Sequence, residues 1–196
     1  MHKLTDYVEL FGGIPQFRIV ETGSRRAPIY NIFGQNDLLE DLFGVNSPKM
    51  NSKVIRTTEQ VTTLSTGNII FSLISGTACI VSEKHKRYLY TQNYIKISPD
   101  SSIDPKFLIY LLNEEEMVRK QFHFGLQGST TLKYTLKQLK GLELPMLPSL
   151  EKQRLIGDVY LKQLKVQALK CREAKEETKV VLYKLEEVMR NERGSV

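Results

Sequence analysis

One short segment of the sequence combines cationic, aromatic and carboxamide side chains in an order suited to nucleic acid. It reads "SEKHKRYLYTQNY" and spans residues 82–94, with basic residues directly before alternating tyrosines and two neighbouring carboxamides. Cations can bind phosphate oxygens, while Gln and Asn can form paired hydrogen bonds with adenine edges and Arg with guanine. The predicted DNA contacts are made by Lys84, Lys86, Arg87, Gln92 and Asn93. The alternative is a solvated hairpin tip whose tyrosines pack in the core.

A second segment, "RKQFHFGLQGSTTLKYT" at residues 119–135, offers hydroxyls and cations on a glycine-containing backbone. Ser and Thr hydroxyls can bind phosphate oxygens, and loops held by a rigid scaffold are where such contacts usually lie. The predicted contacts come from Ser129, Thr130, Thr131 and Lys133, with Gln127 as a further candidate for base readout. A third basic segment at residues 47–58 contributes Lys49, Lys53 and Arg56, although a solvated loop is the simpler explanation for it alone.

Sequence patterns typical of catalytic and metal sites are missing. The chain has no Walker phosphate loop, no G-x-S-x-G, no H-E-x-x-H and no G-x-G-x-x-G. Its three histidines are separated in the sequence, and Cys79 and Cys171 lack C-x-x-C spacing. The carboxylates of Glu114–Glu116 occupy consecutive positions, which on a helix do not face a common point. We therefore predict no catalytic residue, no metal and no cofactor, and favour a binding function.

Composition limits the class of protein. The 196 residues contain 41% hydrophobic and 9% aromatic side chains, which is typical of a folded chain with a core. The 28 basic and 22 acidic residues leave a net charge of +6, which favours a polyanionic partner. No apolar run approaches the roughly 20 residues needed to cross a bilayer, and Asp6 and Glu9 stand where a leader would be apolar. We expect a cytoplasmic protein.

Apolar runs place these segments on one mixed α+β domain, expected at residues 1–148. Strands are expected at residues 17–21 and 28–33, on either side of a polar loop with two adjacent arginines. The most apolar stretch, residues 68–82, is rich in β-branched side chains and favours buried strands interrupted at Gly76. The basic turn of the first segment should lead into a further, aromatic-rich strand.

Helical spacing predicts two helices in the same domain. One covers residues 35–43, where leucines recur on one side. The other covers residues 104–122, with Asp104 as its cap and Pro105 at its first position. Together with the basic segments, these elements describe a domain that could clamp DNA.

Residues 149–193 are expected to form one long helix that projects from this domain. Pro148 favours extended backbone before it, and Ser149 is a good N-cap. At about 1.5 Å per residue the helix is roughly 65 Å long, too long to bury its apolar side on a domain of this size. Positions alternately four and three apart form a heptad seam, whose predicted dimerisation residues are Leu164, Cys171, Ala174, Thr178, Val181, Leu185 and Val188. The seam needs a partner helix from another chain; the alternative is a solvated tail.

The stretch "GSTTLKYTLKQLKGLELPMLPSLEKQRLIGDVYLKQLKV" resembles the end of a target-recognition domain in the specificity subunits of Type I restriction-modification systems. In that family a Gly-Ser/Thr turn, a leucine-spaced stretch and an extended proline-containing segment lead into "E-x-Q-x-x-I", which opens a long conserved helix. The matching residues are Gly128, Ser129, Leu136, Leu139, Leu144 to Pro148, Glu151, Gln153 and Ile156. "TGNIIFSLISGTACIV" and "KLTDYVELFGGIP" are similar to two further pieces of the family, with Asn68 where Asp is usual.

This resemblance implies a non-catalytic subunit that recognises double-stranded DNA and directs DNA methyltransferase (modification) and restriction subunits to a site. Family members usually hold two recognition domains and two long helices in a chain of about twice this length, so this chain resembles a half-subunit. A second copy would supply the missing helix by two-fold symmetry. Such a homodimer would read two inverted copies of one half-site.

Two other classes of function stay open. A stand-alone DNA methyltransferase would share such a recognition domain, but it needs a Gly-rich cofactor loop and an N/D-P-P-Y/F motif, neither of which occurs in the sequence. A coiled-coil scaffold whose globular part binds protein would show no salt-dependent affinity for DNA.

Overall fold

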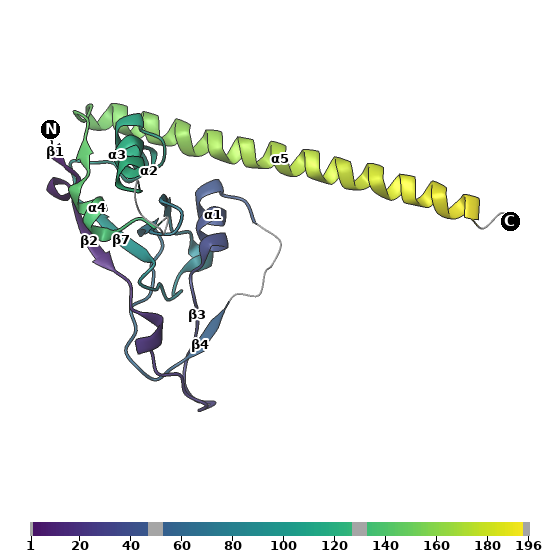
Figure 1. Ribbon diagram of the computed structural model, residues 1–196, viewed down its shortest axis with the longest axis horizontal. Coiled ribbons are helices and arrows are strands. Elements are labelled where there is room, and N and C mark those ends of the chain that lie inside the picture. Colours follow the sequence, from purple (N-terminus) through teal and green to yellow (C-terminus); the bar gives the residue numbers. More distant parts are fainter. Residues whose placement is uncertain (1, 47–52, 127–132, 194–196) are drawn as a thin grey trace.

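The computed structural model describes residues 2–46, 53–126 and 133–193 and shows a globular head from which one helix projects (Figure 1). We call residues 2–148 the head and α5 (Leu150–Arg193) the rod. The head mixes strands with short helices, which confirms the expected α+β class. Within the described ranges, no helix is both long and apolar enough to span a membrane.

The head is built around a four-stranded antiparallel sheet in the order β2-β7-β5-β6. Its strands are β2 (Val8–Gly12), β5 (Ile69–Ser72), β6 (Thr77–Ile80) and β7 (Tyr94–Pro99). Every residue of β5 is buried, as its apolar and β-branched sequence predicts for a central strand. β6 follows β5 through a turn in which Gly76 has a φ of 64°, so the interruption expected at this glycine is confirmed.

Helices pack beside this sheet in the described part of the head. They are α1 (Gln35–Phe43), α2 (Pro105–Asn113), α3 (Glu116–Leu126) and α4 (Leu136–Gly141). α1 has the predicted bounds and ends at Gly44, whose φ of 62° forms a left-handed C-cap. The Asp104 carboxylate accepts hydrogen bonds from the amides of Lys106 and Phe107, which confirms the predicted cap of α2.

The single helix predicted at residues 104–122 is wrong, because the structure has two helices there. The backbone amides of Glu114 and Glu115 both donate to the carbonyl of Tyr110, which ends α2. The Glu115 carboxylate then accepts a hydrogen bond from the Val118 amide at 2.9 Å and caps the start of α3. The acidic run therefore makes the corner between the two helices.

Smaller elements complete the head. β1 (His2–Lys3) pairs with β8 (Glu143–Leu144), and β3 (Ile29–Asn31) pairs with β4 (Val54–Arg56), both antiparallel. Single 3-10 turns form η1 (Leu4–Asp6), η2 (Gln16–Arg18) and η3 (Glu83–His85). The β1–β8 ribbon brings the N-terminal residues to the base of the rod (Figure 1).

The strand predicted at residues 17–21 is wrong. η2 occupies its first half, and among the residues that the structure describes the backbone that follows pairs with no strand. The Val20 amide donates to the Glu59 carboxylate at 3.1 Å, and the Val20 carbonyl accepts from the Thr57 hydroxyl at 2.9 Å. Side chains thus occupy the backbone groups that a neighbouring strand would have needed.

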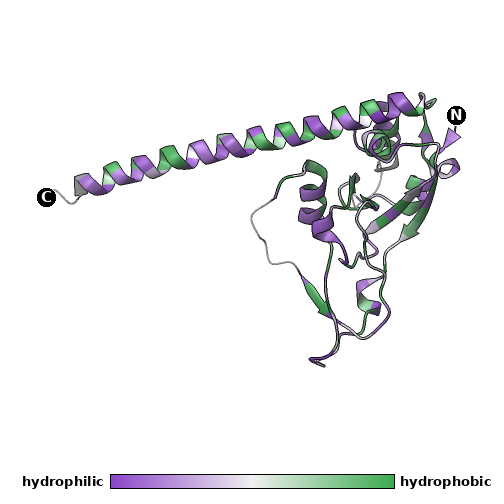
Figure 2. Cartoon of the chain, turned by 180° about the vertical axis from the view of Figure 1, so that it is seen from behind, coloured by the Kyte–Doolittle hydropathy of each residue, from purple (hydrophilic) through white to green (hydrophobic). Residues whose placement is uncertain are grey.

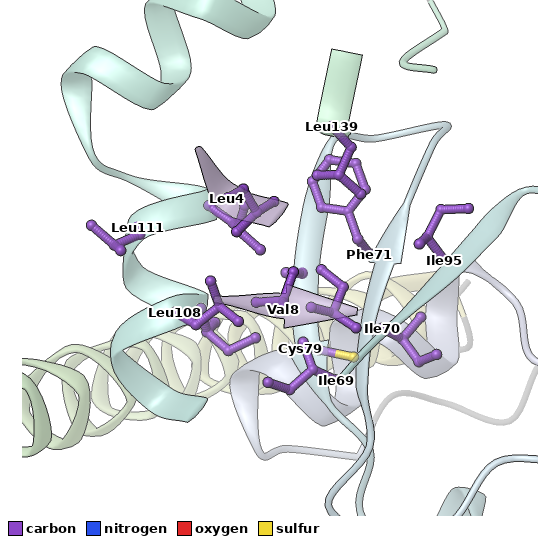
Figure 3. Packing of buried hydrophobic residues seen from close by; sticks show 14 of the residues in the cluster. Leu4, Val8, Ile69, Ile70, Phe71, Cys79, Ile95, Leu108, Leu111 and Leu139 are labelled. Carbon is purple, nitrogen blue, oxygen red and sulfur yellow. The ribbon is translucent and has the colours of Figure 1, made fainter. Parts of the chain in front are cut away.

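Two clusters of buried side chains hold the head together. The larger one joins the four-stranded sheet to α1, α2 and α4, and Figure 3 shows Leu4, Val8, Ile70 and Leu108 from separate segments within it. The smaller one consists of Ile19, Ile32, Ile55 and Leu89.

The smaller cluster belongs to a part of the head that we call the small lobe, residues 14–32 and 53–63, which includes β3 and β4. The small lobe lies at the end of the head farthest from the rod (Figure 1).

The base of the rod is fixed to the head by close contacts. Gln153 is 2% exposed; its side-chain oxygen accepts from the Asp104 amide at 2.8 Å and its nitrogen donates to the Pro148 carbonyl at 2.9 Å. A Cβ at Gly157 would lie 2.6 Å from backbone atoms of Lys106 and Phe107, so only glycine lets α5 approach α2 this closely. The rod therefore leaves the proline corner in one defined direction.

The rod itself is one continuous helix, as predicted. Its 44 residues extend roughly 66 Å at about 1.5 Å per residue. Ile156, Tyr160, Leu161 and Leu164 pack against the large core, whereas almost every residue from Lys165 to Asn191 is exposed. Figure 2 shows hydrophobic and hydrophilic residues alternating along this exposed part.

Candidate nucleic-acid interface

The first basic segment is attached to the head by His85, whose imidazole is 1% exposed. Its Nδ1 donates to the Asp41 carboxylate at 2.8 Å, and its Nε2 lies 3.3 Å from Asp37 and 3.6 Å from Glu40. Burial lowers the pKa of His85, but hydrogen bonds and attraction from Asp37 and Asp41 outweigh burial and raise the pKa to about 9. At neutral pH an imidazolium therefore holds this segment on α1. The sequence signal for it was the i, i+4 spacing of the two aspartates.

Two of the predicted cations in this segment form ion pairs. Lys84 contacts Glu40, and it donates to the Asn46 side-chain oxygen at 3.2 Å. Lys86 pairs with Glu83 at 2.8 Å. Lys86 and Glu83 are 50% and 69% exposed, and an exposed pair of this kind contributes only about 0 to 1 kcal/mol. Lys84 is 49% exposed, but its partner Glu40 is only 11% exposed. Lys86 can therefore exchange its carboxylate for a phosphate at small cost, whereas the same exchange by Lys84 would take a cation away from a largely buried carboxylate.

Arg87 has a backbone φ of 65°, which is unfavourable for a residue with a side chain. Its amide donates to the Leu64 carbonyl at 2.8 Å, and the Tyr88 carbonyl accepts from the Leu64 amide at 2.8 Å, so this geometry is fixed on both sides. The Arg87 side chain is exposed, and within the described ranges no carboxylate pairs with it. Strained backbone of this kind is concentrated at functional sites.

A surface groove of about 410 Å³ joins this segment to the small lobe. It combines cations, hydroxyls and a carboxamide with apolar side chains, which suits both phosphate and base contacts. Its lining is Pro28, Ile29, Tyr30, Asn31, Val61, Thr63, Lys86, Arg87 and Tyr88. Lys86 and Arg87 from the predicted DNA contacts therefore lie on one concave surface, together with small-lobe residues that sequence reasoning did not select.

Two of the three tyrosines of the first segment lie in the core. Tyr90 is 2% exposed and Tyr94 is 3% exposed, with the Tyr94 ring edge-on to Phe33 at a centroid distance of 5.5 Å. Burial raises the pKa of Tyr94 to about 12. These two rings are therefore not available to stack on bases, as the alternative interpretation of this segment expected.

Gln92 and Asn93 lie at the opposite end of the β5–β6 hairpin from Arg87. The Asn93 carbonyl accepts from the Leu73 amide at 2.8 Å, and the Leu73 carbonyl accepts from the Tyr134 amide at 2.9 Å. Gln92 and the neighbouring Lys133 are exposed there. At the other end of the hairpin the Gly67 amide donates to the Val81 carbonyl at 2.8 Å, and the Arg87 amide donates to the Leu64 carbonyl just before it.

The predicted DNA contacts therefore form two separate groups. Lys84, Lys86 and Arg87 lie at one end of the hairpin, and Gln92, Asn93 and Lys133 lie at the other. Arg87 and Gln92 are five residues apart in the chain, so their backbones are separated by at most roughly 17 Å at about 3.3 Å per residue, or about five nucleotide steps at 3.4 Å each along one strand. The structure thus does not bring these side chains to one point, and one duplex would have to touch both ends.

Several predicted residues of the second and third segments lie outside the described residues. They are Gln127, Ser129, Thr130, Thr131 and Lys49. Arg119, at the start of the second segment, donates to the Gly76 carbonyl at 2.8 Å, so it supports the hairpin turn. In the third segment Lys53 is exposed, and Arg56 is half-buried in β4.

The predicted dimerisation residues divide at the point where the rod leaves the head. Leu164 is half-buried against the large core of its own chain. The other predicted residues are all exposed, among them Val181 (56%), Leu185 (57%) and Val188 (58%). The apolar seam beyond Leu164 thus has no cover within the described residues.

No set of three or more His, Cys, Asp or Glu side chains in the described part of the chain is arranged to hold a metal ion. The cluster around His85 consists of an imidazolium with carboxylates, and Cys79 is buried alone in the large core.

Two comparisons with known proteins, by structure and by family model, agree with each other, and a third gives no match. Curated protein sequences give no match. Among solved structures, the HsdS subunit from Thermoanaerobacter tengcongensis has a TM-score of 0.50 and 20% identity, over 88% of this chain and 39% of that chain. A structure described as "Structural basis underlying complex assembly andconformational transition of the type I R-M system" has a TM-score of 0.54 and 22% identity, over 94% of this chain and 42% of that one. The chain therefore has their fold and spans about two fifths of their length.

The sequence also matches a family model described as the Type I restriction modification DNA specificity domain, over residues 17–176. This range includes the small lobe from residue 17, the four-stranded sheet except its β2 strand, and the rod as far as Glu176. The chain belongs to the family of Type I restriction-modification DNA specificity domains.

Proposed function

We propose that this chain is a non-catalytic DNA-recognition subunit of a Type I restriction-modification complex. The groove beside Arg87 is the observation that carries the proposal. Arg87 has no carboxylate partner in the described residues, and its strained backbone holds it next to Lys86. Its guanidinium is therefore suited to bind a phosphate of DNA. The carboxamides of Gln92 and Asn93 at the far end of the hairpin are suited to base edges in the major groove.

Salt dependence of DNA binding tests this proposal. With about five phosphates neutralised per protomer, log affinity plotted against log salt concentration should have a slope near −4 to −5. Fluorescence anisotropy with a labelled duplex measures this slope. Replacing Arg87 and Lys133 with Ala should weaken binding to all sequences by a similar factor, because phosphate contacts carry no sequence information. Affinity that does not change between low and moderate salt would contradict the proposal.

The proposal also assigns the exposed seam of the rod to a second copy of the chain. The seam continues the stripe that packs on the head, because Val181 and Leu185 lie three heptads after Tyr160 and Leu164 and are rotated from them by about 60° at 3.6 residues per turn. About 29 residues, or roughly 44 Å of helix, extend past Leu164, the last rod residue that packs on the large core. A second rod would bury this stripe, and two heads would then read inverted half-sites at a set spacing.

Light scattering, which measures molar mass, tests the pairing of two rods. The two variants compared carry the same number of charges on different sides of the helix. Val181→Glu with Leu185→Glu places two charges in the seam and should convert the dimer to a monomer of 22.6 kDa. Val180→Glu with Tyr183→Glu changes equally exposed residues on the opposite side and should leave the dimer intact. A wild-type chain that is monomeric at all concentrations would refute the homodimer.

The rod offers a further surface for modification and restriction subunits. Leu155, Val159 and Val166 are 65%, 58% and 43% exposed and follow one side of α5, away from the stripe that packs on the head. We assign this outward stripe to the modification subunit. Leu155→Glu with Val159→Glu should abolish co-purification with that subunit while the DNA affinity of the isolated chain stays unchanged. Retained co-purification would place the contact elsewhere.

Titration with S-adenosylmethionine separates this proposal from a stand-alone methyltransferase. A specificity subunit should show no heat of binding by isothermal calorimetry, because the partner subunits would hold the cofactor. Stoichiometric binding would establish the enzymatic alternative.

A further inference from the structure

Net positive charge is concentrated in two parts of the chain. The small lobe, residues 14–32 and 53–63, contains five basic and two acidic residues. The rod contains eleven basic and eight acidic residues, and everything else is balanced at twelve of each. The small lobe and the rod therefore contribute +3 each. The net positive charge of the head comes entirely from the small lobe.

The small lobe presents part of this charge on a defined turn, residues 24–27, which we call the arginine turn. The Ala27 amide donates to the Ser24 carbonyl at 3.1 Å, which places Arg25 and Arg26 at the two central positions. Both arginines are exposed, and no carboxylate pairs with either of them in the described ranges. The turn lies near the tip of the small lobe, at the bottom of Figure 1.

The arginine turn is anchored from beneath by β4. The Arg56 guanidinium donates to the Ser24 carbonyl at 3.2 Å, and the Arg56 carbonyl accepts from the Thr22 amide at 2.9 Å. Farther along, the Thr57 amide donates to the Pro28 carbonyl at 3.2 Å. Backbone on both flanks of the turn is thus bonded to Arg56 or Thr57, which fixes the backbone from which the two arginine side chains extend.

This arrangement gathers guanidinium groups without neutralising them. Arg56 lies directly against a turn that already carries Arg25 and Arg26, so like charges share a small area. The Glu59 carboxylate in this region accepts a hydrogen bond from the Val20 amide. Phe17 nearby in the sequence is 80% exposed, which is unusual for a large aromatic side chain. A polyanion would relieve the repulsion among these guanidinium groups.

We propose that the arginine turn is a second contact for the phosphate backbone of double-stranded DNA, separate from the groove beside Arg87. This inference rests on the proposed function. It gives the head a clamp with two cationic surfaces, one in the groove and one at the tip of the small lobe. Arg25 and Arg26 each bind one phosphate oxygen by charge-assisted hydrogen bonds, so they position the duplex and do not read its sequence.

The test compares two variants with the same loss of charge. Arg25→Ala with Arg26→Ala removes two phosphate contacts, so the salt slope of DNA binding should become less steep by about 1.8, at about 0.9 per phosphate. Arg154→Ala with Lys184→Ala removes two exposed cations from the rod and should keep the wild-type slope. Arg25→Lys with Arg26→Lys keeps the charge and should also keep the slope.

The possible outcomes separate this inference from the function on which it rests. If the wild-type chain binds DNA with a steep salt slope and the arginine variant has the same slope as the rod variant, the arginine turn is not a DNA contact. If the wild-type chain shows no salt-dependent binding, the proposed function itself fails. Equal affinity for an RNA duplex of the same length would overturn the choice of DNA. A thermal unfolding curve equal to wild type establishes that each variant is folded, since the substituted side chains are exposed.

Discussion

Replacing His85 with Gln removes the buried cation that holds the first basic segment on α1. Because the folded pKa of His85 is raised from 6.5 to about 9, the folded state binds a proton more tightly than the unfolded state. The stabilisation is fully present well below pH 6.5 and is lost as the pH rises through 9. At about 1.4 kcal/mol per pKa unit, the full contribution is about 3 kcal/mol, and about 2 kcal/mol of it disappears between pH 6.5 and 8.5.

Urea unfolding at a series of pH values in this window measures the effect. The wild-type free energy of unfolding should fall by about 2 kcal/mol from pH 6.5 to pH 8.5, whereas His85→Gln should be less stable at pH 6.5 and nearly independent of pH. His123→Gln, at an exposed position on α3, should behave like wild type. The same pH slope in wild type and in His85→Gln would refute the role of the imidazolium.

Three substitutions test other features of the head and the rod. Arg87→Gly should relieve the left-handed strain and raise the free energy of unfolding by up to about 1 kcal/mol in chemical unfolding. The same variant should make the salt slope of DNA binding less steep by about 0.9. A loss of stability would show that the backbone is not strained. Gly157→Ala should lower the melting temperature because its Cβ meets α2 backbone at 2.6 Å, whereas Gly141→Ala, with open space around it, should be close to neutral; equal effects would show that α5 can shift. Gln153→Ala should cost about 2 kcal/mol of unfolding free energy by leaving the Asp104 amide unpaired, and an unchanged value would mean that water replaces the carboxamide.

Local sequence signals were sufficient to predict the helices whose ends are marked by capping residues, glycine or proline. α1 has the predicted bounds because its leucines repeat at helical spacing and Gly44 can take the left-handed cap. The rod was predictable from Pro148, the N-cap position and the absence of proline in all the residues that follow. Such signals act within a few residues, so they need no knowledge of the tertiary fold.

Features set by distant contacts could not be predicted in this way. The strand expected at residues 17–21 fails because Glu59 and Thr57, about forty positions later, take its backbone hydrogen bonds. The strain at Arg87 depends on Leu64, and the charge of His85 depends on aspartates 44 and 48 residues earlier in the chain.

The division of the predicted DNA contacts has a similar origin. Residues 84–87 and 92–93 are neighbours in sequence, and only the register of β7 on β5 shows that they lie at opposite ends of a hairpin. The sequence predicted only a polar loop at the arginine turn. The hydrogen bond from the Arg56 guanidinium to the Ser24 carbonyl shows that a third arginine lies against this turn.

Selection of bound duplexes from a random DNA pool by the full chain tests most directly whether two paired heads read DNA. An enriched inverted repeat with a fixed spacer, lost in the Val181→Glu with Leu185→Glu variant, is the expected result. Enrichment of an isolated half-site by both proteins would contradict the pairing of rods, and a pool that shows no enrichment would contradict sequence recognition itself.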